Sequence, residues 1–131
     1  MEAGIARALE RDPRIAYALV FGSVAREAAH AGSDLDVGVG LVAGASLSHH
    51  DIGDLTARLE TAVGRTVDLV LLDTAPPGLA FRAFRDGRAV FERDHARLVA
   101  RKARAILEYL DFQPTERLLA EGALRAAARG R

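Results

Sequence analysis

The 131-residue sequence contains no cysteine, which excludes disulfide bonds, thiolate zinc sites and cysteine nucleophiles. It also lacks a net charge, because 18 basic residues balance 18 acidic ones, and no overall field would attract nucleic acid or an anionic membrane. Its apolar runs, such as Ile15 to Phe21 and Val67 to Leu72, the second interrupted by Asp68, are far too short to span a bilayer. The N-terminal residues have no apolar segment typical of a signal peptide. We therefore expect a cytoplasmic protein without membrane contact or direct nucleic-acid binding.

What is present is the composition of a globular protein, with 50% hydrophobic and 27% charged residues. No internal repeat and no linker divides the sequence, so we expect residues 1–131 to form a single domain. Its core would span about residues 3–93, and C-terminal helices would cover about residues 94–128.

Hydrophobic periodicity predicts an α/β or α+β fold, a small mixed β-sheet flanked by helices. Short apolar or alternating runs predict strands at residues 15–21, 34–41, 66–72 and 88–92, the last at a sheet edge. Helical spacing predicts helices before Asp12-Pro13, at 24–29, 49–63, 94–110 and 115–128, and a turn of helix from Pro76-Pro77 to Phe84. Ser48 and Gly64 are expected to begin and end the 49–63 helix.

The first chemical motif is the pair Gly22-Ser23, which directly follows the predicted buried strand. A glycine there lets a ligand approach the backbone closely, and the N–H groups at the start of the next helix favour a phosphate. The Ser23 hydroxyl would add a further donor. Taken alone, however, the pair is more typical of a simple strand-to-helix turn with a serine cap.

The second motif is Asp34 and Asp36, at the start of the second predicted strand. Residues two apart on a strand point to the same side, with Cα atoms about 6.5–7 Å apart, so both carboxylates can reach one cation or a pair of cations. Magnesium prefers such oxygen ligands and fills its remaining positions with water or substrate phosphates. A lone Asp-x-Asp is also typical of a solvated turn.

Asp68 makes the functional interpretation stronger, because it interrupts an otherwise apolar strand, "TVDLVLLD". A buried, unpaired carboxylate is costly, so it normally has a partner or a metal. If the third strand lies beside the second, Asp68 can face the same cleft as Asp34 and Asp36. Three carboxylates and a phosphate-binding turn together indicate a two-metal phosphoryl-transfer site.

The segment "GSVAREAAHAGSDLDVGV" resembles the G-S-x10-D-x-D signature of the DNA-polymerase-beta-like nucleotidyltransferases. Gly22, Ser23, Asp34 and Asp36 stand at its fixed positions, and Asp68 matches the third catalytic carboxylate. Within that superfamily the chain resembles the minimal nucleotidyltransferase (MNT) family. The segments "YALVFGSVARE", "SDLDVGV", "TVDLVLL" and "DGRAVFERD" follow that family's order, so the resemblance covers roughly residues 15–112.

The resemblance implies a nucleotidyltransferase fold and a site in which Asp34, Asp36 and Asp68 hold two Mg²⁺ ions. Gly22 and Ser23 would grip the phosphates that leave as pyrophosphate, and Arg26 lies close enough in sequence to assist. Many MNT proteins are antitoxins encoded beside a HEPN-domain ribonuclease toxin, and some transfer AMP from ATP to a tyrosine of that toxin. The resemblance therefore implies an AMP-transferring antitoxin in a hetero-oligomer with a HEPN toxin.

Three other interpretations stay open at the level of sequence. The chain could neutralise a toxin by binding alone, with little or no transfer. It could transfer a nucleotide to a small molecule or an RNA end, although it lacks an extra helical acceptor domain and a positive net charge. It could also be a structural module whose acidic residues are merely solvated.

The remaining candidates favour structural roles. The group His49, His50, Asp51 and Asp54 resembles a metal cluster but is more typical of a solvated helix start. Phe81, Phe84 and Phe91 are expected in the core rather than as a base-stacking platform. In the C-terminal helices, Leu98, Ala105 and Leu110 could close the core, while Leu118, Leu119 and Leu124 would face a partner.

Overall fold

The computed structural model describes residues 1–22 and 34–129. The described helices are α1 (Glu2–Glu10), α2 (His49–Val63), α3 (Pro77–Asp86) and α4 (His95–Arg129), with a short 3-10 helix, η1 (Leu72–Thr74). The described strands are β1 (Ile15–Phe21), β2 (Leu35–Leu41), β3 (Val67–Leu71) and β4 (Arg88–Glu92). The predicted helix at 24–29, with Ser23 and Arg26, lies outside the described residues.

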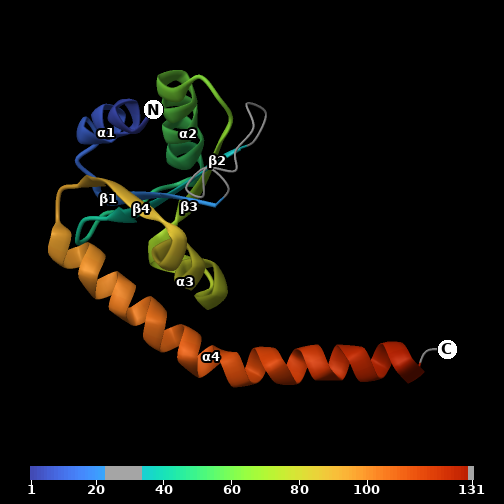
Figure 1. The fold of residues 1–131 in the computed structure, drawn as a ribbon. Coiled ribbons are helices and arrows are strands. Elements are labelled where there is room, and N and C mark those ends of the chain that lie inside the picture. Colours follow the sequence, from blue (N-terminus) through green and yellow to red (C-terminus); the bar gives the residue numbers. More distant parts are fainter. Residues whose placement is uncertain (23–33, 130–131) are drawn as a thin grey trace.

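The described strands form one mixed sheet in the order β3-β2-β1-β4 (Figure 1). β1 pairs antiparallel with both β2 and β4, whereas β2 and β3 run parallel. The predicted small mixed sheet is therefore confirmed, and β4 lies at an edge as expected. The parallel pair brings the start of β2 beside the start of β3, which matters for the carboxylates.

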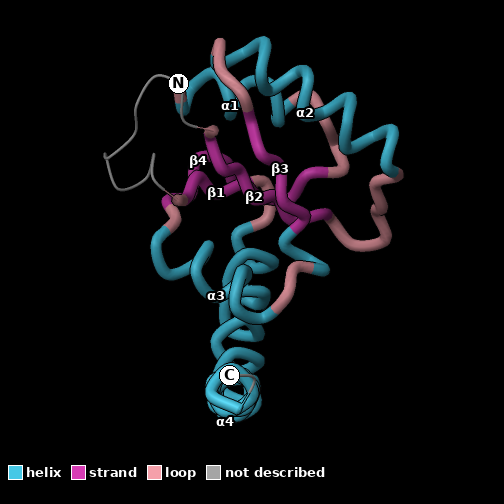
Figure 2. The backbone as a smooth tube through the Cα atoms, turned by 90° about the vertical axis from the view of Figure 1, so that its right-hand side faces the viewer, coloured by secondary structure: helices cyan, strands magenta, loops and turns pink. Residues whose placement is uncertain are grey.

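Helices cover both faces of the sheet: α1 and α2 lie on one side, and α3 and the first half of α4 on the other (Figures 1 and 2). Every residue of β1 is buried because it is central and covered twice. Its alternate side chains enter two separate cores, the first including Ile15, Ala18 and Val20 and the second Tyr17, Leu19 and Phe21.

Two glycines of β2 allow the second core to form on the α3–α4 side. A side chain at Gly38 would crowd Leu72, and one at Gly40 would overlap the ring of Tyr17. Asp36 lies on this same face of β2, two residues before Gly38, as the alternation of the strand predicts. Asp36 therefore lies on the face of the sheet that packs against α3 and α4.

Local sequence signals predict both ends of α2 and the start of α3 correctly. Ser48 caps α2, and its hydroxyl accepts a hydrogen bond from the Asp51 backbone while the Asp51 carboxylate accepts one from the Ser48 backbone. Gly64 ends α2 in the left-handed conformation, at φ 70°. α3 begins at Pro77, a position where the missing N–H of proline costs nothing.

The prediction of two C-terminal helices is wrong, because α4 runs without interruption from His95 to Arg129. Residues 111–114 are helical as well, although Pro114 lacks the N–H that an interior helical position would use. Helix-forming residues on both sides outweigh this local cost. Figure 1 shows α4 bending about midway and extending away from the sheet. None of the described helices has the length and apolar content needed to cross a membrane.

Candidate functional site

Asp36 and Asp68 lie directly opposite each other in the register of the parallel β2–β3 pair. Asp36 is also opposite Phe21, the last residue of β1, in the antiparallel pairing of β1 with β2. The end of β1 and the starts of β2 and β3 therefore meet at one place. The predicted convergence of the second and third strands is confirmed by this register.

Gly22 follows β1 at this place with φ 80°, a left-handed conformation that favours glycine. A Cβ atom at Gly22 would fall inside the Asp36 carboxylate group. The backbone of Gly22 is thus held against Asp36, and no larger residue fits without moving it. Ser23 follows in sequence but lies outside the described residues.

A pocket of about 260 Å³, which we call the acidic pocket, opens between this edge of the sheet and α3. Its lining combines the sheet residues Phe21, Gly22, Asp36, Asp68 and Val70 with the α3 residues Leu79, Arg82 and Asp86. A pocket of this size can hold part of a nucleotide, such as its phosphate groups. The three carboxylates and one guanidinium in the wall give it the chemistry of a site for cations and phosphates.

The acidic residues at this site repel one another. Burial raises the pKa of Asp36 above its ordinary value, and the nearby charges of Asp68 and Asp34 raise it further. The folded protein therefore pays to keep Asp36 ionised, and a bound cation would remove that cost. Asp34 is exposed and immediately precedes β2, and from there its charge acts on Asp36.

One premise of the sequence interpretation is wrong. Asp68 was expected to be buried in an apolar strand, but β3 is an edge strand and the Asp68 side chain is exposed. Its cost of burial therefore does not explain its presence. Its register opposite Asp36 and its position in the pocket wall carry the functional argument instead.

The profile of the Polymerase beta, Nucleotidyltransferase family matches residues 4–96, which include all of β1 to β4. The chain belongs to this nucleotidyltransferase family. No curated protein matches the sequence significantly.

Solved structures resemble this chain over nearly its whole length, beyond the residues that the family profile matches. One chain of a toxin-antitoxin complex crystallised with AMP-PNP is 22% identical, with a TM-score of 0.82, over 94% of this chain and 98% of that chain. A chain from a complex of a tri-AMPylated HEPN toxin with MNT antitoxin, from Shewanella oneidensis, is 19% identical, with a TM-score of 0.74, over 95% and 99% of the two chains. A minimal nucleotidyltransferase is 32% identical, with a TM-score of 0.55, over 66% and 88%.

The family implies a divalent cation, and the donor set of the site fits one. Asp36 and Asp68 offer hard carboxylate oxygens from adjacent strands, and Mg²⁺ is typically held by one or two carboxylates plus phosphates and water. Within residues 1–22 and 34–129, however, no three acidic or histidine side chains form a ready metal cage. The chain would therefore supply part of a coordination shell, and substrate phosphates would supply more.

Arg82 and Asp86 are residues of the pocket wall that the sequence interpretation missed. They lie one helical turn apart on α3, and nothing in the local sequence links α3 to the carboxylate motif. The Asp86 carboxylate also accepts two hydrogen bonds from Arg85, at 2.9 and 3.0 Å. Arg82 is exposed and brings a positive charge beside the acidic group. Only the packing of α3 against the sheet reveals this role.

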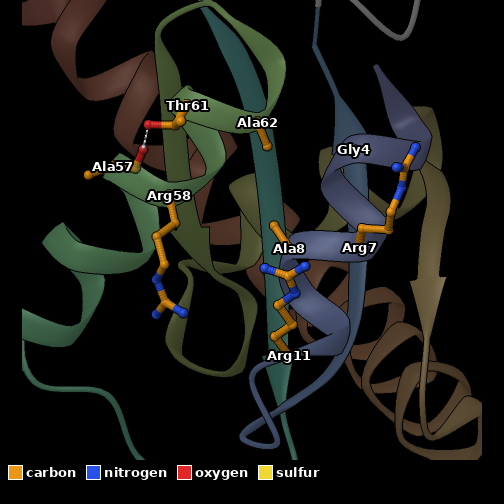
Figure 3. A pocket seen from close by; sticks show the side chains of 8 residues that line it. All are labelled: Gly4, Arg7, Ala8, Arg11, Ala57, Arg58, Thr61 and Ala62. Atoms are coloured by element: carbon orange, nitrogen blue, oxygen red, sulfur yellow. Dashed lines mark hydrogen bonds between the residues drawn. The ribbon is translucent and has the colours of Figure 1, made fainter.

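A larger pocket, of about 580 Å³, lies between α1 and α2, on the opposite side of the sheet from the carboxylates (Figure 3). Arginines 7, 11 and 58 surround a floor of alanines and Gly4. The Thr61 hydroxyl is already used, because it donates to the Ala57 carbonyl at 3.0 Å. Among the described residues, the lining of this pocket offers no carboxylate that could hold a cation.

The residues predicted to be structural have structural contacts. Asp51 caps α2 and Asp54 pairs with Arg58 at 3.3 Å, so neither serves a metal cluster with the adjacent histidines. Phe84 is buried in the second core, and Phe81 stacks on Tyr109 of α4, with ring centroids 4.1 Å apart. The aromatic pair ties α3 to α4 and so supports one wall of the acidic pocket.

Proposed function

We propose that this chain is an antitoxin that transfers AMP from ATP to a hydroxyl group, that of a tyrosine, on a HEPN-class toxin. The observation that carries the proposal is the register of Asp36 opposite Asp68 beside the Gly22 turn. The family match supports nucleotidyl transfer, and the complexes of similar fold, one with AMP-PNP and one with an AMPylated HEPN toxin, support the nucleotide and the partner.

In the proposed reaction the acceptor oxygen attacks the α-phosphorus of ATP. A new oxygen–phosphorus bond forms while the bond from the α-phosphorus to the bridging oxygen breaks, and pyrophosphate leaves with that oxygen. The Asp68 carboxylate accepts the proton of the acceptor hydroxyl, because it is exposed at the mouth of the pocket. The Gly22 backbone and the Ser23 hydroxyl bind the departing phosphates.

Two Mg²⁺ ions, when bound, supply Lewis-acid stabilisation of the attacking and leaving oxygens. Asp34 and Asp36 would hold one ion, and Asp68 would join them at the second. The guanidinium group of Arg82 places a positive charge on the α3 side of the pocket, where it can offset the negative charge of the triphosphate. The raised pKa of Asp36 supports this assignment, because burial and the neighbouring carboxylates disfavour its ionised form and a bound cation would stabilise that form.

The acceptor would come from the partner, which we propose docks along the exposed part of α4. Large apolar side chains are exposed there, and Leu107, Leu118 and Leu119 are 63%, 68% and 66% exposed. Leu98 and Ala105 are buried as predicted, but Leu110 is 57% exposed rather than part of the core. The side chain of Leu124 lies outside the described ones. A toxin that covers this face would stand beside the sheet face that bears the carboxylates.

The test is to incubate the purified chain with labelled ATP, Mg²⁺ and a purified HEPN-class toxin. We expect AMP on the toxin, located to a tyrosine by mass spectrometry, and at least a hundredfold loss in an Asp34→Ala, Asp36→Ala variant. An Asp54→Ala variant removes a carboxylate from α2, far from the site, and should keep the transfer rate.

The rival interpretations give different results in the same experiment. If the toxin gains no AMP but is still inhibited, including by the double variant, the chain acts by binding alone. If labelled AMP appears on an RNA end or a small molecule but not on the toxin, the acceptor assignment is wrong. Neither result would change the family assignment, which rests on the sequence match.

A further inference from the structure

A third pocket, which we call the arginine pocket, lies where the first half of α4 meets β1 and η1. Its volume is about 310 Å³. Its lining consists of Tyr17 from β1, Asp73 from η1, and Arg97, Ala100, Arg101 and Arg104 from α4. It is on the same side of the sheet as the acidic pocket, but Tyr17 and Gly22 are five residues apart on an extended strand, roughly 16 Å.

The three guanidinium groups are fixed by bonds to backbone carbonyls. Arg97 donates through Nε to Leu41 at 2.7 Å, and Arg101 donates through Nε to Leu72 at 2.9 Å. Arg104 donates through Nη2 to the carbonyl of Asp73 at 3.0 Å. A guanidinium carries five N–H donors, so each group is held in place and retains donors for another acceptor. The three guanidinium groups are therefore preorganised for binding an anion.

Two carboxylates face these groups and offset only part of their charge. Glu108 accepts a hydrogen bond from Arg101 at 3.1 Å and lies 3.8 Å from Arg104. Asp73 accepts a hydrogen bond from the Leu41 backbone at 3.3 Å. With three arginines against two carboxylates, the cluster keeps a positive excess. Arg101 is only 7% exposed, so water solvates the charge of its guanidinium group only weakly.

The hydroxyl of Tyr17 is a second, independent observation that points to an anion-binding site, beside the three fixed guanidinium groups. The residue is 1% exposed, and its hydroxyl has no hydrogen-bond partner within the part of the chain that the structure describes. The ring is held against Gly40, where any side chain would overlap it. Burial, followed by the charge of Asp73, raises the pKa of Tyr17 to about 12, so the hydroxyl keeps its proton and can donate. An unpaired buried hydroxyl is costly unless an acceptor is supplied.

We propose that the arginine pocket binds a phosphate-class anion, which accepts hydrogen bonds from the Tyr17 hydroxyl and from the guanidinium groups of α4. Such an anion would join β1 and α4, because these two elements contribute its donors together. It would thereby fix the base of α4 against the sheet. The proposal does not depend on nucleotidyl transfer, since none of its residues lines the acidic pocket.

The test measures the thermal stability and calorimetric binding of the full chain in EDTA, at constant ionic strength. The probes are inorganic phosphate, pyrophosphate and AMP, with chloride as the reference anion. We expect a binding constant that falls about three- to tenfold in Tyr17→Phe and about tenfold in Arg104→Gln. Lys102→Gln removes the same charge from an exposed position of α4 outside the pocket and should bind like the parent.

Tyr17→Phe separates a binding role from a structural one. Because the hydroxyl has no partner, its removal should leave the melting temperature without anion unchanged or slightly higher. Binding of phosphate or pyrophosphate with this pattern indicates a free anion, and binding of AMP alone indicates a phosphate carried by a nucleotide; both support the site. No binding of any probe, or equal binding by the parent, Tyr17→Phe and Arg104→Gln proteins, would overturn it.

Discussion

At the scale of the residue, the acidic site depends on how closely the Gly22 backbone approaches the Asp36 carboxylate. The left-handed conformation of Gly22 and the lack of space for a Cβ atom are two separate reasons for glycine there. Asp36 in turn faces Asp68 in the register. A larger residue at position 22 therefore displaces the Asp36 carboxylate from its place opposite Asp68.

Gly22→Ala should lower the free energy of unfolding by about 1–3 kcal/mol and reduce AMP transfer at least tenfold, because the new methyl group displaces Asp36. Denaturant unfolding and the labelled-ATP assay measure the two effects. Gly53→Ala is the matched control: it lies within α2 with open space around it, and should stabilise the protein by about 0.5–1 kcal/mol. A fully active Gly22→Ala protein would contradict the packing argument.

The Asp36 carboxylate gives a pH-dependent prediction. Its pKa is raised in the folded state, so ionised Asp36 costs stability above that pKa, and the cost disappears as the pH falls below the ordinary value of an aspartate, about 3.9. In EDTA at pH 7, Asp36→Asn should therefore melt about 1–3 °C above the parent, and the difference should shrink toward pH 4. Asp54→Asn, which breaks the pair with Arg58, should show no such gain. A lower melting temperature for Asp36→Asn at every pH would contradict this account.

Arg82 is expected to act on the nucleotide rather than on the fold, because it is exposed in the wall of the acidic pocket. Arg82→Gln should raise the KM for ATP about three- to tenfold and leave the melting temperature within about 1 °C of the parent. Steady-state kinetics with saturating toxin measure this. The control Arg88→Gln changes an exposed arginine of β4 that pairs with Glu2, and should leave the KM unchanged.

At the scale of the element, α4 has two parts with different surroundings. Its first half is anchored by arginines to the ends of β2 and η1, and by the stacking of Tyr109 on Phe81. Its second half extends from the sheet with Leu118 and Leu119 exposed. A helix that extends without covering its own domain is available to a partner.

Deletion of residues 114–131 should weaken binding of the HEPN-class toxin at least about tenfold, while binding of ATP with Mg²⁺ stays within about twofold. Calorimetry with each ligand measures the difference. A full-length Leu118→Gln, Leu119→Gln variant should reproduce the loss of toxin binding without shortening the helix. Equal loss of both ligands would show that the second half of α4 supports the fold instead.

At the scale of the whole molecule, one sheet face carries both chemical features, and the other face is closed by α1 and α2. The acidic pocket and the arginine pocket lie at opposite ends of β1, so the central strand connects them rigidly. Ligands at these places bind only the folded chain, and each should stabilise it by mass action.

ATP with Mg²⁺ should therefore raise the melting temperature by about 5–10 °C at a concentration near 100 times the Kd, which corresponds to about 2.7 kcal/mol. The increase should require both components and be absent in Asp36→Ala. Differential scanning calorimetry measures it, and Asp54→Ala should respond like the parent. An unchanged response in Asp36→Ala would favour the interpretation of the acidic residues as merely solvated.

The sequence by itself determined the elements whose signals are local. Ser48 and Gly64 marked the ends of α2, and the alternation after Asp34 placed Asp36 on one face of β2, because capping and strand periodicity act between near neighbours. The motif of Gly22 with Asp36 was also readable in one segment. The prediction of two C-terminal helices is wrong because a single proline imposes only a limited cost within a long helix-forming segment.

Tertiary structure decided which distant residues share a site. Only the parallel pairing of β2 with β3 placed Asp68 opposite Asp36, and only the packing of α3 brought Arg82 to the same pocket. Tyr17 and the arginines of α4 are separated by about 80 residues and meet because Gly40 leaves room for the tyrosine ring. Strand order and helix docking depend on burial summed over the whole chain, so no local pattern encodes these contacts.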